Sequence, residues 1–212
     1  MRGISILFVL IFSVSAVTKS QTDPEAMKIL DRFSSSALAA PSISMSFDLI
    51  TDDKIEGFNN EVPGTVIICK DMYSLDLGDN IIWYNGKILW NYLPAEKEVT
   101  ITEPSDDDFS FQSRPSEIFS MYKEGFKVRL IDEDTDRYVI DLYPEDLESE
   151  YIRIRLSLGK TFPDLKSVEY KNKNGLTITI KVREFDLKKV PDKSSFTFDP
   201  EKFRDTEVID LR

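Results

Sequence analysis

The chain has 212 residues, of which 38 are acidic and 27 are basic; it has no histidine, and its net charge is −11. This acidic balance repels nucleic acid and anionic lipid, so we expect no nucleic-acid partner. The absence of histidine excludes Ser-His-Asp, Cys-His and zinc-hydrolase sites as they are usually built.

Residues 1–20 have the pattern of a secretory signal peptide. A positive charge near the start is followed by the apolar run 4–14 and then by small residues. The run is shorter than the ~20 residues that a membrane-spanning helix needs. We therefore expect cleavage after Ala16 or after Ser20, which leaves residues 21–212 as a single, soluble, exported domain.

A helix is predicted over residues 24–40. The carboxylate of Asp23 can cap the first-turn amides. Pro24 fits the first turn because the backbone N–H at that position, which proline lacks, has no acceptor within the helix. Apolar residues then recur at helical spacing as far as Ala37, and the helix should end before Pro41.

From Ile43 onward the apolar period becomes two, which is typical of half-buried strands. The only cysteine, Cys69, ends one apolar run and suits a small buried position. About ten strands follow one another with short turns and no crossover helix in the second half, which excludes a parallel α/β sheet. The expected strands are 43–49, 64–70, 73–77, 81–84, 87–92, 99–101, 126–130, 138–142, 152–158, 168–170, 176–182 and a short late one at 196–198.

Two connections carry specific predictions. Asn85 and Gly86 should form a tight type I′ turn, because both residue types tolerate positive φ. Residues 103–113 are interpreted as an acidic loop, and residues 115–123 as a short helix that begins at a proline.

An acidic stretch resembles a calcium loop only in part. Asp132, Asp134 and Asp136 have the spacing of the first three EF-hand ligands, but Arg137 stands where that loop needs glycine and Tyr143 where it needs glutamate. We expect a solvated hairpin turn here and no metal site.

The other acidic groups give no catalytic signature. The run 106–108 is interpreted as solvated, with a weak divalent-ion site or a docking patch as the alternative. A pair of carboxylates could hydrolyse glycans, but no spacing singles out a pair. We predict no catalytic residue and no cofactor.

Aromatic residues gather in two places. Trp83, Tyr84, Trp90 and Tyr92 belong to one predicted hairpin, and five more aromatics lie between residues 109 and 126. They could fill a core, because aromatics favour strands and interiors. They could equally line an apolar cavity capped by the two predicted helices, and the pattern alone leaves both interpretations open.

The aromatic hairpin also carries a resemblance. The stretch 84–94, YNGKILWNYLP, followed by EVTI at 98–101, resembles the DGK-x-x-W-x-Y-x-P … x-V-x-I segment of the periplasmic lipoprotein carrier family LolA. FTFDP at 196–200 and Val208 are similar to the closing F-x-F-x-P … V of that family. The order of the predicted elements agrees over essentially the whole mature chain.

This resemblance implies a mainly β (α+β) fold, namely an incomplete antiparallel β-barrel of about ten to eleven strands with an α-helical lid over a hydrophobic cavity. It also implies a periplasmic chaperone that takes acylated lipoproteins from an inner-membrane ABC transporter, shields their acyl chains and passes them to an outer-membrane acceptor. No cofactor is implied, and we expect a monomer.

Site residues are assigned on this basis. Ile118, Phe119 and Tyr122 are predicted lid residues, the latter two filling the cavity when it is empty. The family commonly has an arginine that latches the lid; this chain has none near that place, so Lys70 and Arg114 are the candidates. Alternation assigns the following residues to the cavity wall: Met45, Phe47, Leu75, Trp90, Tyr92, Val99 and Ile101.

Two other functions are compatible with the sequence. One is a carrier or sensor of a different lipid or hydrophobic envelope ligand on the same fold. The other is a hydrolase of envelope glycans that uses two carboxylates.

Overall fold

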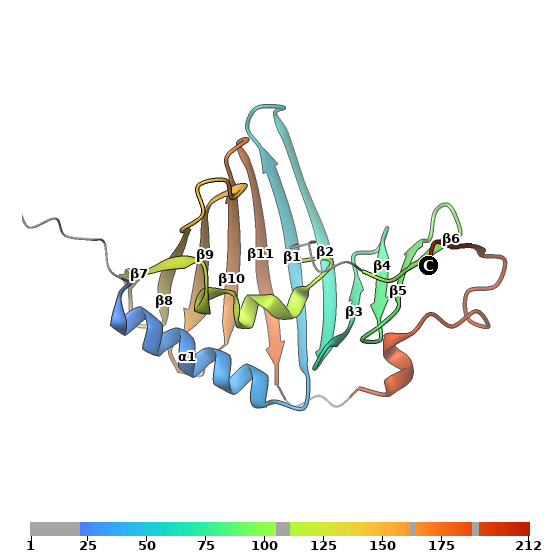
Figure 1. Ribbon diagram of the computed structural model, residues 1–212, viewed down its shortest axis with the longest axis horizontal. Helices are drawn as coiled ribbons and strands as arrows, with labels where there is room; N and C mark the ends of the chain where they lie inside the picture. The colour runs from blue at the N-terminus through green and yellow to red at the C-terminus, as the bar shows by residue number, and fades with distance from the viewer. Residues whose placement is uncertain (1–21, 105–110, 162–163, 188–190) are drawn as a thin grey trace, which may run out of the picture.

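The computed structural model describes residues 22–104, 111–161, 164–187 and 191–212 (Figure 1). The predicted signal peptide and the acidic run 106–108 therefore lie outside the described residues. No helix in the described part of the chain is long and apolar enough to cross a membrane.

The described residues form one large sheet with a few helical segments. The helical segments are α1 (Pro24–Ala39), η1 (Pro115–Phe119), η2 (Met121–Lys123) and η3 (Lys193–Phe196), of which the last three are 3-10 helices. The strands are β1 (Ile43–Asp53), β2 (Phe58–Cys69), β3 (Met72–Asp76), β4 (Ile81–Tyr84), β5 (Leu89–Leu93), β6 (Glu98–Thr102), β7 (Phe126–Glu133), β8 (Arg137–Pro144), β9 (Tyr151–Gly159), β10 (Leu165–Asn172), β11 (Leu176–Asp186) and β12 (Glu207–Asp210).

All twelve strands belong to a single sheet in the order β12-β6-β5-β4-β3-β2-β1-β11-β10-β9-β8-β7. Neighbours are antiparallel except for β12, which pairs in parallel with β6. Within the described residues β7 and β12 do not pair with each other, so the sheet does not close. The predicted fold class, an open antiparallel barrel with a helical lid, is confirmed, with twelve strands where the resemblance implied about ten to eleven.

Helix α1 begins where the sequence predicted and is attached to the sheet at its start. Asp23 Oδ1 accepts a hydrogen bond from the backbone N–H of Glu25 at 2.8 Å, which caps the helix. The backbone N–H of Asp23 donates to the carbonyl of Val128 on β7 at 2.9 Å. The N-terminus of α1 is therefore held against an edge strand, and α1 crosses one face of the sheet from there (Figure 1).

The connection between β4 and β5 is longer than the predicted type I′ turn. It comprises residues 85–88, and Gly86 has positive φ (93°) whereas Asn85 does not, although a type I′ turn needs both. Asn85 Oδ1 instead accepts hydrogen bonds from the backbone N–H groups of Lys87 and Ile88 at 3.0 and 2.9 Å. The asparagine side chain thus replaces the backbone acceptor of a tight turn.

The predicted helix at 115–123 is divided into the two 3-10 helices η1 and η2, with Ser120 between them. So short a segment is a marginal α-helix on its own. Phe119 at the end of η1 and Tyr122 in η2 are both buried.

The predicted late strand at 196–198 is wrong. Phe196 is the last residue of η3, and the strand that follows, β12, lies further along the chain. No alternating apolar run marks β12, because this short strand has one outer edge unpaired among the described residues and is mostly exposed.

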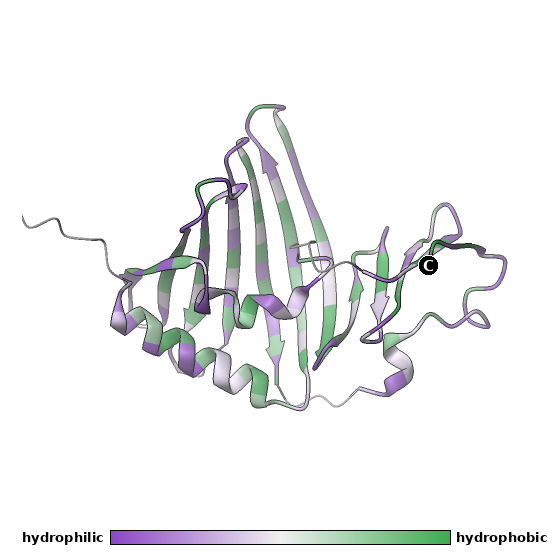
Figure 2. Cartoon of the chain, viewed as in Figure 1, coloured by the Kyte–Doolittle hydropathy of each residue, from purple (hydrophilic) through white to green (hydrophobic). Residues whose placement is uncertain are grey.

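Hydrophobic and hydrophilic residues alternate along the strands (Figure 2). The apolar residues form two clusters on opposite faces of the sheet. The main cluster lies on the face that α1, η1 and η2 cover, which we call the inner face. The second lies on the outer face of β4, β5 and β6, where Trp83, Tyr92 and Val99 pack against Phe198 and Phe203 from the end of the chain. Ring centroids there are 4.9 Å apart for Tyr92 and Phe203 and 5.3 Å apart for Trp83 and Phe203.

Gly64 of β2 lies opposite Phe47 of β1, and the phenyl ring occupies the space of the missing side chain. A Cβ atom at Gly64 would lie 2.5 Å from Phe47 Cζ and 2.9 Å from Leu77 Cδ2. The absence of a side chain at Gly64 therefore allows Phe47 to lie flat on the inner face between two long strands.

We predict that Gly64→Ala lowers the free energy of unfolding by about 1–3 kcal/mol, the usual cost of overpacking. In the Gly64→Ala/Phe47→Leu double variant, the loss should be smaller than the sum of the two single losses, because the smaller side chain relieves the overlap. Urea unfolding of the four proteins measures this coupling, with Thr65→Ala on exposed strand surface as the control. Additive losses would contradict the prediction.

Candidate functional site

The inner face is the candidate site, and its cover consists of α1, η1 and η2. Phe119 of η1 is 0% exposed, and its ring centroid lies 5.6 Å from that of Phe33 on α1 and 6.4 Å from that of Phe185 on β11. Ile118 and Tyr122 are buried beside it. The structure therefore places all three predicted lid residues between the sheet and the solvent, with their side chains directed inward.

The seven predicted cavity residues fall into two groups. Met45, Phe47 and Leu75 are buried on the inner face in the main cluster. The other four lie on the neighbouring strands β5 and β6 with the opposite orientation, and form the cross-strand pairs Trp90–Ile101 and Tyr92–Val99.

The seven residues therefore do not line one cavity. On β5 the residue that packs into the main cluster is Leu89, the neighbour of Trp90. Sequence alternation separates the two sides of a strand but does not say which side meets the cover. The aromatic side is buried here by Phe198 and Phe203, residues about a hundred positions further along the chain.

Among the described residues, side chains fill most of the space beneath the cover. A hollow of about 60 Å³ lies near the end of α1. A hollow of about 270 Å³ lies at the inner surface near Gln112, with aliphatic walls from Leu49, Val62, Leu77 and Leu93. An apolar ligand would therefore have to displace cover side chains, Phe119 above all, to reach the main cluster.

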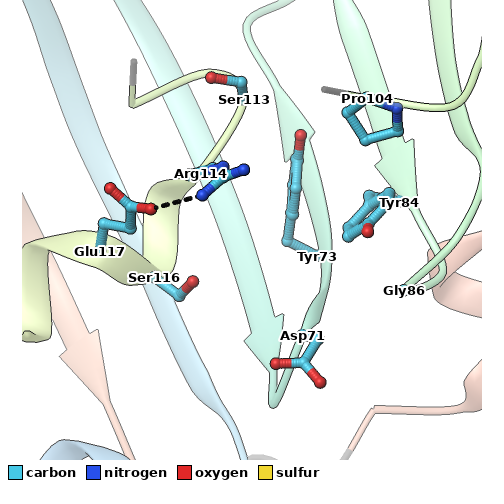
Figure 3. Close-up of a pocket in the computed structure, with 9 residues that line it drawn as sticks. All are labelled: Asp71, Tyr73, Tyr84, Gly86, Pro104, Ser113, Arg114, Ser116 and Glu117. Carbon is cyan, nitrogen blue, oxygen red and sulfur yellow. Dashed lines mark hydrogen bonds and ion pairs between the residues drawn. The ribbon is translucent and has the colours of Figure 1, made fainter. Parts of the chain in front are cut away.

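A larger hollow of about 350 Å³ adjoins η1 (Figure 3). Tyr73 on β3 and Tyr84 on β4 form one wall, with ring centroids 5.6 Å apart. Arg114, the residue before η1, points toward Tyr73, and its Nη1 donates a hydrogen bond to Glu117 Oε1 at 3.1 Å (Figure 3). One of the two candidate latch residues thus lies between the cover and the sheet.

Lys70, the other candidate, is at the exposed turn between β2 and β3 and has a positive φ of 55°. No ion pair joins it to another residue in the described ranges.

One contact between two parts of the cover was not predicted from the sequence. The hydroxyl of Tyr122 on η2 donates to Asp31 Oδ1 on α1 at 2.7 Å. Burial of the phenol, together with the negative charge of Asp31, raises the pKa of Tyr122 to about 12. Asp31 is exposed on the solvent side of α1. The sequence pattern therefore predicts only a solvated helix residue at this position.

The calcium-like stretch forms the turn between β7 and β8, as predicted. Asp134 Oδ1 accepts hydrogen bonds from the backbone N–H groups of Asp136 and Arg137, both at 2.8 Å, and these bonds lower the pKa of the Asp134 carboxyl. The carboxylate is thus engaged in the turn itself. Among the described residues there is no group of three or more His, Cys, Asp or Glu side chains arranged to hold a metal ion.

Residues 16–184 match the family described as outer membrane lipoprotein carrier protein LolA. The chain belongs to this family. The match includes the cover, β1–β10 and most of β11, and it ends before η3 and β12. The LolA family region therefore contains the cover and nearly all of the inner face, with Phe185 just beyond its end. A comparison with curated proteins found no match.

Solved structures with the same fold include an uncharacterized conserved protein from Thermus thermophilus, with 16% identity, a TM-score of 0.57, and coverage of 88% of this chain and 99% of that one. A putative outer membrane lipoprotein-sorting protein domain from Vibrio parahaemolyticus has 12% identity, a TM-score of 0.44, and coverage of 82% and 96%. A LolA superfamily protein from Nitrosomonas europaea has 13% identity, a TM-score of 0.43, and coverage of 82% and 97%.

Tyr122→Phe should weaken the cover without changing its shape, and near neutral pH should cost about 1 kcal/mol of unfolding free energy. The pKa of the phenol is about 12 in the folded chain against 10.0 for the ordinary group, so the protonated form is favoured on folding. The stabilisation is therefore complete below pH 10 and lost as pH rises through 12. Over that range the wild type should lose roughly 2–3 kcal/mol relative to the variant.

Urea unfolding of both proteins between pH 7 and pH 12 measures this difference. From pH 7 to pH 9 the gap between the two proteins should stay constant, which serves as the internal control. A gap that remains constant through pH 12 would contradict the buried, hydrogen-bonded state of the Tyr122 hydroxyl.

Proposed function

We propose that this protein is a periplasmic carrier of lipoproteins, whose acyl chains it shields between the inner face of the sheet and the cover. The proposal includes uptake from an inner-membrane lipoprotein-releasing ABC transporter and delivery to an outer-membrane acceptor. It is supported by membership of the LolA family and, above all, by one observation: the apolar inner face of an open sheet is covered by short segments whose aromatic side chains fill the space that a ligand would need.

A self-filled site suits a carrier because it limits affinity. Burial of a methylene group contributes roughly 0.8 kcal/mol, so several long acyl chains in an open cavity would bind too tightly for release. When the cover must move aside, contacts of Phe119 and Tyr122 are exchanged for contacts of the ligand, and only the difference contributes to binding. The carrier then holds the chains better than water does and yields them to a bilayer.

Two polar contacts would set how readily the cover moves. The Tyr122–Asp31 hydrogen bond joins η2 to α1. Arg114 pairs with Glu117 of η1 and lines the same hollow as Tyr73 on the sheet. We assign the latch to this pair of contacts, with Arg114 in the place of the family's arginine. The acidic surface of the chain would direct docking toward basic patches on the partner proteins.

Export requires removal of the signal peptide. Mass spectrometry of the protein from the periplasmic fraction should show a mature chain that begins at Val17 or at Gln21. Retention of Met1 in that fraction would contradict the predicted cleavage.

We predict that Phe119→Ala lowers the free energy of unfolding by about 3–5 kcal/mol, because it leaves a cavity under the cover. The same variant should bind a synthetic triacylated cysteinyl peptide more tightly than the wild type, because the ligand no longer displaces a phenyl ring. Fluorescence titration gives the affinities, and thermal unfolding with and without the peptide gives the stabilisation.

Tyr92→Ala is the matched control, since it removes a buried ring from the outer face and should leave peptide affinity unchanged. If neither the wild type nor Phe119→Ala binds the acylated peptide, the carrier proposal is wrong. Mass spectrometry of ligand extracted from the native protein distinguishes a lipoprotein from another lipid, which would point to the alternative carrier or sensor.

A further inference from the structure

Two hollows near the end of α1 share lining residues, and we call the two together the groove. Ser116 of η1 lines both the hollow of about 350 Å³ and the hollow of about 60 Å³. The turn between β2 and β3 is also shared, because Lys70 lines the small hollow and Asp71 the large one. The two hollows therefore lie next to each other beside η1, one at the two tyrosines and the other at Phe119.

The small hollow is the apolar end of this groove. Its walls include Ala37 and Leu38 of α1 and Ile43 and Ile68 of the strands, and it reaches Phe119. Leu38 remains 55% exposed, unusually high for a leucine at the edge of an apolar hollow. A hydrocarbon chain that displaced Phe119 from this side would enter the main cluster directly.

One polar atom in the apolar end has no partner. Ser42 is 2% exposed and lines the small hollow, yet its Oγ makes no hydrogen bond to any residue in the described part of the chain. A buried hydroxyl without a partner is costly to the folded protein. The oxygen itself is covered, so a ligand would reach it only as the displacement of Phe119 widens the hollow. A ligand group that accepts a hydrogen bond there would remove the cost, and a carbonyl next to a hydrocarbon chain has the required chemistry.

The other end of the groove is polar and electrically balanced. Tyr73 and Tyr84 provide aromatic surface, and Arg114 is already paired with Glu117. Across the two hollows, the positive charges of Lys70 and Arg114 are matched by the negative charges of Asp71 and Glu117. With a net charge of −11 on the chain, this end suits an uncharged polar group better than a phosphate.

We propose that this groove receives the acyl end of the ligand: the chain lies against Phe119, its ester or amide carbonyl accepts a hydrogen bond from Ser42 Oγ, and its uncharged polar end lies beside Tyr73 and Tyr84. The inference rests on the proposed function and adds to it a carbonyl-recognising residue and a ligand class. The protein would thereby distinguish acyl chains from alkyl chains of the same length.

Two neutral amphiphiles test this discrimination, 1-monopalmitoylglycerol, which carries an ester carbonyl, and 1-O-hexadecylglycerol, its ether analogue. The wild type should bind the ester about three- to ten-fold more tightly, the contribution of one hydrogen bond. Ser42→Ala should bind both equally and should unfold at the same temperature as the wild type or higher, since the hydroxyl it removes has no partner among the described residues.

Ser157→Ala is the matched control, because Ser157 is also buried and also has an unpartnered Oγ among the described residues, but belongs to β9 away from the groove. This control should keep the preference for the ester. Equal binding of ester and ether by the wild type, or a preference that survives in Ser42→Ala, would overturn the inference while leaving acyl carriage intact. If neither amphiphile nor the acylated peptide binds, the proposed function fails as well.

A third ligand tests the polar end. The phosphate ester of monopalmitoylglycerol should bind more weakly than the uncharged compound at low salt, and Asp71→Asn should narrow that difference. Tighter binding of the phosphate compound would overturn the assignment of an uncharged polar end.

Discussion

The contact on which this structure depends is the burial of the sheet's inner face by side chains that belong to short, separate segments. A sheet that does not close leaves one face of its central strands without a second sheet to pack against, and apolar residues on that face need another cover. Here the rings of Phe33 and Phe119 lie 5.6 Å apart and meet above the strands. The polar attachments of the cover are few among the described residues: the cap at Asp23 joins α1 to β7, and the Tyr122 hydroxyl joins η2 to α1.

The sheet itself is stabilised by contacts that do not involve the cover. On the outer face of β8 and β9, the carboxylate of Asp141 is 1% exposed and accepts hydrogen bonds from Arg155 Nε and Nη2 at 2.6 and 2.8 Å. The hydroxyl of Tyr143 donates to the same carboxylate at 3.0 Å. A buried carboxylate is tolerated only when it is paired in this way. Movement of the cover would leave this network unbroken.

At the other end of the sheet, the C-terminal segment of the chain stabilises the strands, again without involving the cover. Phe198 and Phe203 stack at a centroid distance of 5.4 Å and bury the aromatic side of β4 and β5, and β12 then extends the sheet beyond β6. The outer face of these strands is therefore buried in a cluster that stabilises the fold, and their inner face borders the groove. This division separates stability from ligand exchange, because the aromatic residues most prominent in the sequence lie away from the site.

Sequence alone determined most of the local structure. The period of two marks the strands because a strand presents alternate residues to water, and Asp23 with Pro24 marks the start of α1 because they suit unpaired first-turn amides. It also assigned Met45, Phe47, Leu75 and the lid residues to their side of the sheet. Only the tertiary structure decided which side of β5 and β6 faces the cover, that Asp31 meets Tyr122, and that Ser42 and the two tyrosines line hollows beside η1. Alternation defines the two sides of a strand but does not say which side faces the cover. That orientation depends on segments far apart in the chain, which meet only after folding.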